Sequence, residues 1–222
     1  NLSSIERKKL IAFLENNAKP KNANYQYDFF YNNCATKIRS VLDTVFPNKI
    51  SYNKNHITTN FTMRDLINSK ISHNTWSNIG INIALGSVID HKASFNEYQF
   101  LPEYIFKALN NSQFNNVPIV KETNILIEKD DSKTEKSSSF FLSPYFIFSL
   151  LSVIILLITY KDFKQQKISK TLDFILLFTT GLIGVFLLLL WFATNHTATA
   201  NNYNILWGFA PNLIMAFLIL KE

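Results

Sequence analysis

Only one cysteine, Cys34, occurs among the 222 residues of the sequence. A lone cysteine excludes an internal disulfide framework, and it excludes zinc and iron–sulfur sites that are built from several cysteines. The four histidines do not have the spacing of a metal site, so we expect neither a metal nor an organic cofactor. The sequence also lacks a basic block. Its net charge of +6 is spread along the chain, which argues against nucleic acid as a partner.

Charged residues are scarce in the last part of the chain. Residues 1–139 are polar and rich in Asn and Lys, whereas residues 140–222 are mostly Phe, Leu and Ile. The apolar part contains long runs at 144–160, 174–193 and 205–220. A membrane span needs roughly 20 predominantly apolar residues, whereas a water-soluble helix needs a polar face. We therefore predict three transmembrane helices rather than a buried hairpin of a soluble protein.

The loops between these runs differ in charge, which predicts an orientation. The first loop, 161–171, contains Lys161, Lys164, Lys167 and Lys170. The second loop, 194–204, has neither Lys nor Arg. Because lysine-rich loops stay in the cytoplasm, residues 161–171 are predicted to be cytoplasmic. Residues 1–143 and 194–204 then face the periplasm of a bacterial inner membrane.

The polar part combines signals for helices and for strands. Ser3 and Glu6 form a capping-box pattern at a helix start, and Pro102 suits the first turn of another helix. A further helix is predicted over 34–45, and residues 117–127 are typical of one or two strands. The predicted class is therefore α+β.

A charged, serine-rich stretch, EKDDSKTEKSSS, lies between the two parts. Its composition cannot bury enough apolar surface to order itself, so it is typical of a linker. We divide the chain into a domain at 1–127, a linker at 128–143 and a membrane region at 144–222. The chain begins with Asn and without a charged leader, so we expect it to be the C-terminal part of a longer one.

Cys34 stands at the first turn of its predicted helix, where Asn32 or Asn33 can act as the cap. Unpaired N–H groups and the positive end of the helix dipole stabilise a thiolate at this position. Lys37 and Arg39 add positive charge nearby. The thiolate is the reactive form of cysteine, so Cys34 is the candidate nucleophile. The alternative is a small, buried and unreactive side chain, which is the commonest role of a free cysteine.

A thiol nucleophile also needs a base, and this is usually a histidine. His56, His73 and His91 have no recognisable catalytic context, and a place in a solvated loop is the role we favour for each. His196 lies in the external loop close to the membrane, either as a supporting residue of the site or as a polar interfacial residue. The sequence therefore assigns no base.

Four segments of the polar part resemble a known family when they are taken in order. They are YQYDFFYNNCATKIRSVL, NFTMRDLI, NTWSNIGINIALGSVIDHKAS and EYQFLPEYI, and they cover most of residues 25–120. They resemble the N-terminal periplasmic domain of the Lnb-type lipoprotein N-acyltransferases. The tail NHTATANNYNILWGFAP is similar to the segment that this family places between its last membrane helices.

The resemblance implies a circularly permuted papain-like (NlpC-type) fold, in which Cys34 matches the nucleophile and the catalytic histidine precedes it. Residues 1–33 contain no histidine, so we expect only part of that domain here, and no activity unless the missing part is supplied. The implied reaction passes an acyl chain from a phospholipid through a thioester of Cys34 to the N-terminal amine of a diacylated lipoprotein. The implied partners are the phospholipid donor, the lipoprotein acceptor and the membrane.

Residues around the nucleophile and in the other segments are candidates for supporting roles. Backbone amides beside Cys34, or the side chains of Asn32 and Asn33, can stabilise the oxyanion of such a reaction. Arg39 can pair with a phosphate headgroup or form a surface salt bridge. Asp90 can orient a base or cap a turn. Arg64 lies in the same family-like segments.

Two alternatives remain open at the level of the sequence. Papain-like folds mostly cleave amide bonds, so a membrane-tethered cysteine peptidase or cell-wall amidase is the first. The second is a non-enzymatic, membrane-anchored binding domain, in which Cys34 is expected to be buried and unreactive. The products that accumulate in cells without the protein distinguish the first alternative: diacylated lipoproteins indicate the acyltransferase, and altered cell-wall peptides indicate the amidase.

Overall fold

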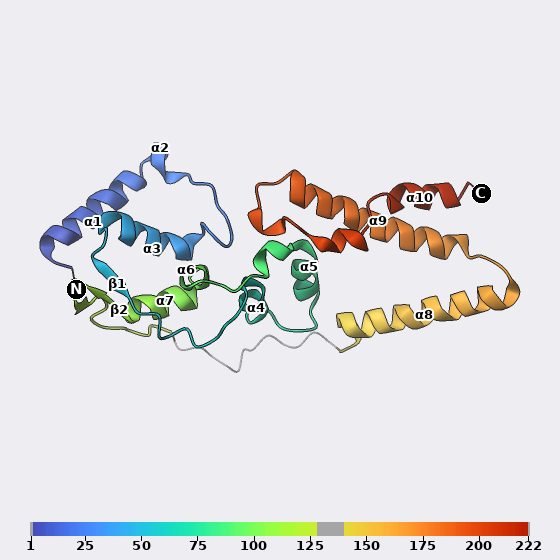
Figure 1. Cartoon of the computed structure of the whole chain (residues 1–222), viewed down its shortest axis with the longest axis horizontal. Coiled ribbons are helices and arrows are strands. Elements are labelled where there is room, and N and C mark those ends of the chain that lie inside the picture. Colours follow the sequence, from blue (N-terminus) through green and yellow to red (C-terminus); the bar gives the residue numbers. More distant parts are fainter. Residues whose placement is uncertain (1, 128–139, 222) are drawn as a thin grey trace. The chain divides into compact units, whose positions relative to one another are not determined.

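A computed structural model describes residues 2–127 and 140–221. The chain forms two compact units (Figure 1). Unit 1 comprises Asn1–Met63 and Lys92–Lys129, and unit 2 comprises Arg64–His91 and Asp130–Glu222. Helices predominate over a small antiparallel sheet, which confirms the predicted α+β class. Most of the predicted linker lies outside the described residues, and the division at residues 127 and 143 stays a prediction.

Unit 1 is built mainly from short helices. Their bounds are α1 Ser4–Asn17, α2 Pro20–Ala23, α3 Cys34–Val45, α6 Phe95–Tyr98 and α7 Pro102–Asn110. The predicted capping box starts α1, because the Ser3 hydroxyl accepts from the Glu6 amide and the Glu6 carboxylate accepts from the Ser3 amide. Pro102 occupies the first turn of α7, as predicted, where its missing N–H leaves no hydrogen bond unmade.

The sheet of unit 1 has the order β1-β2-β3, and both pairs are antiparallel. Its strands are β1 Ile50–Tyr52, β2 Ser112–Phe114 and β3 Val117–Pro118. The strand predicted at 117–127 is thus limited to its first two residues. Phe114 of β2 packs edge-on against Phe46 at the end of α3, with 5.1 Å between ring centroids. This aromatic contact joins α3 to the sheet.

A second aromatic cluster supports the start of α3. Phe30 and Phe100 are both buried, and their ring centroids lie 4.9 Å apart. The buried Tyr98 donates its hydroxyl to the Thr59 carbonyl at 2.7 Å and accepts from the Phe61 amide at 2.9 Å. The first contact packs Phe100 against the segment that leads into Cys34, and the hydrogen bonds of Tyr98 fix residues 59–61 to the end of α6.

Unit 2 contains two long apolar helices, α8 Pro144–Gln165 and α9 Lys170–Phe192. By length and composition, both can cross a membrane. A rise of about 1.5 Å per residue gives each helix about 33 Å or more, enough for a hydrocarbon core of about 30 Å. Large apolar side chains are exposed along both helices, among them Leu156, Leu157 and Leu189. Apolar surface of this extent needs a lipid or protein cover.

The prediction of a third transmembrane helix over 205–220 is wrong for the described part of the chain. There the structure has two helices of sufficient length, and α10, Asn212–Ile219, has 8 residues. At about 1.5 Å per residue, α10 spans about 12 Å. The apolar run is divided because residues Tyr203–Leu206 form a 3-10 turn (η5) and α10 begins only after Pro211.

The short helix α10 packs along α9. Phe217 of α10 lies against Phe174 and Phe178 of α9, with ring centroids 5.6 and 6.1 Å apart. Two glycines of α9, Gly181 and Gly184, are buried at this contact, and a Cβ on either would meet the backbone of the segment 208–213. The absence of side chains at these glycines therefore allows the close approach.

The remaining segment of unit 2, residues 64–91, folds against the loop that follows α9. The helix α4, Met63–Asn68, lies at the start of this segment, apart from its first residue. The helix α5, Trp76–Ala84, and the 3-10 turn η1, Ser87–Ile89, follow. The Gly86 amide donates to the Ala198 carbonyl at 2.9 Å, beside the 3-10 turn η4 Thr197–Thr199, and the Ser87 amide donates to the Asn201 carbonyl at 3.0 Å. Asn202 donates its side-chain amide to the carbonyls of Ile83 and Ala84.

Candidate functional site

A tight turn delivers the chain into the N-terminus of α3. Asp28 and Asn32 exchange backbone hydrogen bonds of 3.2 and 3.0 Å across this turn. The Asp28 carboxylate accepts from the amides of Phe30 and Tyr31, both at 2.9 Å. Asn32 donates its side-chain amide to the Gln26 carbonyl at 2.6 Å. These hydrogen bonds all lie within residues 26–32 and fix the turn locally. The helix α3 begins two residues later, at Cys34.

Asn33 is the cap of α3 and is only 5% exposed. Its side-chain oxygen accepts from the Thr36 amide at 2.9 Å. Its side-chain NH₂ donates to the carbonyls of Phe29 at 2.9 Å and Phe100 at 2.8 Å. Both the oxygen and the nitrogen of the Asn33 side chain are therefore hydrogen-bonded within the protein. These bonds position the start of α3 against the aromatic cluster.

Cys34 is the first residue of α3, and its side chain is exposed. The backbone N–H groups of Cys34 and Ala35 make no hydrogen bond to any described residue. Such groups at a helix start carry partial positive charge and can bind an anion. The thiol thus lies beside two available backbone donors.

Two cavities share Cys34 in their lining. The first, which we name the apolar groove, has a volume of about 300 Å³ between α3 and α7. It is lined by Cys34, Ala35, Ile38, Pro102, Ile105, Phe106 and Leu109. The second, which we name the polar pocket, has a volume of about 430 Å³ between α3 and the segment from α1 to residue 25. Its lining combines the polar or charged side chains of Asn17, Asn22, Tyr25, Cys34, Lys37, Ser40 and Thr44 with the apolar side chains of Phe13, Ala23 and Val41.

The positive charge of the polar pocket comes from Lys37, one turn after Cys34. Its ammonium lies over the Tyr25 ring, 4.5 Å from the centroid. No carboxylate of a described residue pairs with Lys37. The lysine therefore keeps an uncompensated charge on the wall of the polar pocket.

Neither of the cavities that Cys34 lines contains a histidine. His56 packs edge-on against Phe95 at 5.7 Å between centroids, and burial lowers its pKa from the ordinary value of 6.5. His73 and His196 are exposed in unit 2, and the ring of His91 contacts the Val88 carbonyl at 2.8 Å. The described residues thus place no histidine in the lining of either cavity that contains the thiol.

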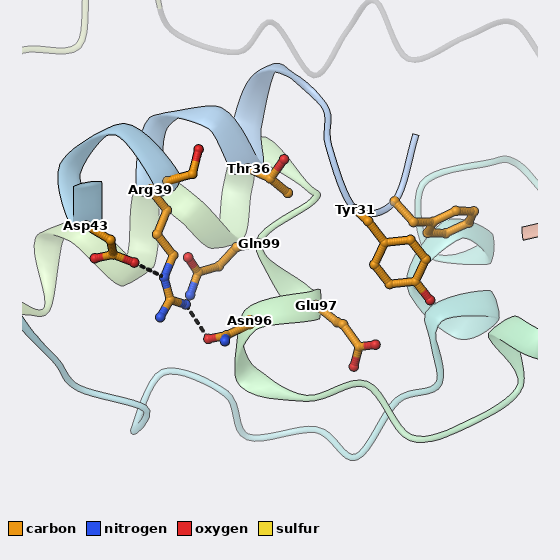
Figure 2. A pocket seen from close by; sticks show the side chains of 9 residues that line it. Tyr31, Thr36, Arg39, Asp43, Asn96, Glu97 and Gln99 are labelled. Atoms are coloured by element: carbon orange, nitrogen blue, oxygen red, sulfur yellow. Dashed lines mark hydrogen bonds and ion pairs between the residues drawn. The ribbon is translucent and has the colours of Figure 1, made fainter. Parts of the chain in front are cut away.

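Arg39 faces a third cavity, of about 250 Å³, on α3 (Figure 2). Its guanidinium pairs with Asp43 at 3.1 Å, donates to Asn96 and stacks over the Tyr52 ring at 4.4 Å. Asp43 also accepts from the Tyr52 hydroxyl at 2.7 Å, and burial followed by this hydrogen bond raises the pKa of Tyr52. These contacts hold α3, β1 and α6 together, so the charge of Arg39 is largely compensated within the protein.

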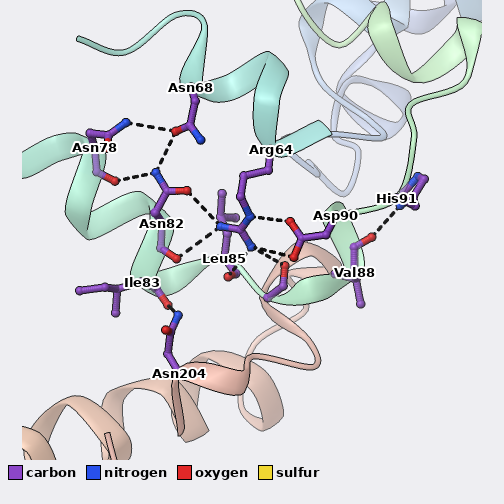
Figure 3. A network of polar contacts seen from close by, with 11 residues as sticks. Arg64, Asn68, Asn78, Asn82, Ile83, Leu85, Val88, Asp90, His91 and Asn204 are labelled. Atoms are coloured by element: carbon purple, nitrogen blue, oxygen red, sulfur yellow. Dashed lines mark hydrogen bonds and ion pairs between the residues drawn. The ribbon is translucent and has the colours of Figure 1, made fainter. Parts of the chain in front are cut away.

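Arg64 and Asp90 form an ion pair in unit 2, with 2.5 Å between Nε and Oδ1 (Figure 3). The remaining guanidinium donors reach Asn82 Oδ1 at 3.1 Å and the carbonyls of Leu85 and Gly86 at 3.1 and 3.0 Å. Arg64 therefore fastens α4 to the chain after α5. Its donors are used within the protein, so the geometry indicates a structural role.

Several residues that build these sites carry no local signal in the sequence. Asn82, Asn202 and Asn204 support unit 2 through long-range hydrogen bonds, and an asparagine-rich sequence does not reveal such partners. Ile105 and Phe106 line the apolar groove, although their sequence context predicts only the apolar face of a helix. The half-exposed Ile38 and Phe106 mark a surface that needs cover.

Comparison with known families gives two matches. Residues 1–69 match the family model described as the Lnb N-terminal periplasmic domain, and residues 135–222 match the Lnb transmembrane domain. The first match contains Cys34, Asn33, Arg39 and Arg64, and the second contains His196. No curated protein and no solved structure matches the chain.

Proposed function

Because this chain belongs to the Lnb family of inner-membrane proteins with a periplasmic segment, we propose that it is a thiol-dependent N-acyltransferase. Its domains are those of a membrane protein that modifies lipoproteins. The proposed reaction moves an acyl chain from a phospholipid to the N-terminal amine of a diacylated lipoprotein. One observation carries the proposal: an exposed thiol at the start of α3, between an apolar groove and a polar pocket.

The proposed reaction has two steps that share one thioester. In the first, the Cys34 thiolate attacks the ester carbonyl carbon, the bond to the glycerol oxygen breaks, and the lysophospholipid leaves with a proton. In the second, the lipoprotein amine attacks the thioester carbonyl, the carbon–sulfur bond breaks, and the amine proton returns to the thiolate. The base is a histidine that precedes Cys34, as the family pattern implies, and residues 1–33 contain none.

Both steps pass through an oxyanion that needs hydrogen-bond donors. The available backbone N–H groups of Cys34 and Ala35 suit this role, since they lie at the positive end of α3. Asn33 supports them indirectly, because its amide is bonded to Phe29, Thr36 and Phe100. Asn32 is likewise tied to the Gln26 carbonyl.

The membrane helices fit this chemistry. With residues 161–171 in the cytoplasm, as their lysines predict, the chain before α8 faces the periplasm. Both proposed substrates are lipids of the outer leaflet, and α8 and α9 would anchor the chain in the membrane that contains them. The alternative of a non-enzymatic binding domain expects a buried thiol, whereas Cys34 is exposed.

The test is a Cys34→Ala substitution in the chromosomal copy that encodes this chain, in cells without another lipoprotein N-acyltransferase. We expect the N-terminal peptide of a native lipoprotein to lose one fatty acyl group, which mass spectrometry measures directly. The exposed Ser51 of β1 offers a matched control, and Ser51→Ala should leave the peptide triacylated. A triacylated peptide in the Cys34→Ala strain would reject the proposal, and altered cell-wall peptides there would indicate an amidase.

A further inference from the structure

We propose that the two cavities that share Cys34 divide an acyl-ester substrate between them. The apolar groove holds the alkyl chain of the acyl group, and the polar pocket holds the phosphate-bearing headgroup. The inference rests on the proposed function, because it assigns the two ends of the phospholipid donor to named residues. The carbonyl carbon that joins these ends must reach the sulfur of Cys34, which lines both cavities.

The groove has the form and chemistry of an alkyl-binding site. Ala35 and Ile105 are buried at its base, whereas Ile38 is 48% and Phe106 is 54% exposed. Apart from the thiol, every lining side chain is a hydrocarbon. Each methylene of a ligand that is buried against such a surface raises the association constant by up to about fourfold.

The groove is ill suited to a peptide. An extended peptide carries an N–H and a C=O group at each residue, and buried groups of this kind need partners. The side chains from Pro102 to Leu109 that line the groove provide none, and the N–H groups of Cys34 and Ala35 at its end are the donors left for a ligand, enough for one carbonyl but not for an extended peptide. An alkyl chain carries no such groups, so we assign the groove to it.

The polar pocket has the charge that a phosphate requires. Lys37 lies on its wall, and no acidic side chain lines it. Asn17, Asn22, Ser40 and Thr44 add polar groups to the lining. A lysine ammonium is a strong partner of phosphate oxygens, so the pocket favours an anionic or zwitterionic headgroup over a neutral one.

The groove is tested by labelling Cys34, the one thiol of the chain, with methyl, propyl and pentyl methanethiosulfonate. The thiolate attacks the sulfenyl sulfur, a disulfide forms, and methanesulfinate leaves. Each rate is divided by that of N-acetylcysteine in the same detergent solution, which removes differences between the reagents. We expect the relative rate to rise about tenfold from methyl to pentyl, within the limit set by four buried methylenes.

Substitutions at the exposed wall of the groove test the assignment further. Ile38→Ser and Phe106→Ser should reduce the preference for the pentyl reagent at least threefold. The control Ile5→Ser removes another exposed apolar side chain, 81% exposed on α1, and should leave the preference unchanged. Equal relative rates of the three reagents in the unsubstituted protein would overturn the assignment of the groove.

The polar pocket is tested with an anionic and a cationic reagent, sulfonatoethyl and trimethylammonioethyl methanethiosulfonate. Their rate ratio cancels any change in the reactivity of the thiol itself. We expect Lys37→Gln to lower the ratio of anionic to cationic labelling about threefold at low salt. Lys8→Gln removes an exposed charge of α1 as a control and should leave the ratio unchanged. An unaltered ratio in Lys37→Gln would overturn the assignment of the polar pocket.

These labelling experiments do not require acyl transfer, so their outcome is separate from that of the lipoprotein assay. Chain-length preference together with normal lipoprotein acylation in the Cys34→Ala strain would reject the proposed function and leave the alkyl site in place. Loss of acylation in that strain, together with equal labelling by all reagents, would reject the two assignments and leave the proposed function in place.

Discussion

Asn33 shows how much of the site depends on one buried amide. It caps α3, and it also satisfies two carbonyls, one in the turn before Cys34 and one at Phe100. Phe100 is 67 residues further along the chain. The residue that precedes Cys34 therefore links the start of α3 to a distant part of the core. A change here acts on the position of Cys34 rather than on its chemistry.

Replacing Asn33 by Ala should destabilise unit 1 by about 2–3 kcal/mol, because the helix loses its cap and buried carbonyls lose a donor. Thermal unfolding of the purified protein, followed by circular dichroism, measures this loss. Asn24→Ala removes an exposed amide near the end of α2 and is the matched control. Equal melting of Asn33→Ala and the unsubstituted protein would contradict the role of Asn33.

His56 should make the stability of unit 1 depend on pH. Burial, the main cause, lowers its pKa below the ordinary 6.5, so the unfolded chain binds a proton more readily than the folded one. The contribution of His56 is complete above about pH 6.5 and declines as the pH falls through 6.5 toward the lower pKa of the folded state.

We therefore expect the melting temperature to fall between pH 7.5 and pH 5.5, and His56→Phe to remove part of this fall. Phe fits the contact with Phe95 and cannot be protonated. His73→Phe, at an exposed position of unit 2, provides the comparison. An unchanged pH dependence in His56→Phe would show that another group is responsible.

At the scale of elements, local signals in the sequence were reliable and long-range ones were not. The capping box at Ser3, the start of α3 after Asn33 and the proline at the start of α7 were all predicted, because each depends on neighbours within one turn. Cys34 was placed correctly at a helix N-terminus for the same reason. The ion pair of Arg64 and Asp90 depends on tertiary folding and left no local signal.

The third apolar run shows why hydropathy alone failed. Composition makes 205–220 resemble a span, but hydropathy averages over the turn η5 and Pro211, which divide the run. Hydropathy also carries no information on close packing, such as that of the backbone at 208–213 against the glycines of α9. Gly181 and Gly184 make this packing possible on α9, and their fit to residues 208–213 appears only in three dimensions.

Gly184→Ala should therefore disturb the contact of α9 with the segment before α10, because the added Cβ would meet the backbone at Gly208 and Ala210. We expect a loss of about 1–3 kcal/mol, as for other overpacked sites. The melting temperature in detergent measures it. Gly80→Ala in α5 is the control, because a Cβ there meets nothing within 4 Å and Ala favours a helix by about 1 kcal/mol. Similar melting of the two variants would contradict the close approach.

At the scale of the whole molecule, both matched domains and both membrane helices describe an inner-membrane protein with a periplasmic segment. The two compact units do not follow the order of the chain, since Arg64–His91 belongs to the unit of the membrane helices. Hydrogen bonds from this segment to the loop 198–202 account for that grouping. The composition of residues 64–91, which resembles that of the polar part, does not reveal it.

This interleaved order has a consequence for how unit 1 is tethered. The polypeptide passes between the units at 63–64, at 91–92 and again at 129–130, and the first two passages are held together by the bridge between Thr62 and Lys92. A protease cut within 128–139 would sever only one passage. The other two passages would still join unit 1 to residues 64–91, and these residues are bound to the loop 198–202 by hydrogen bonds, so the serine-rich stretch is not the sole link between the units.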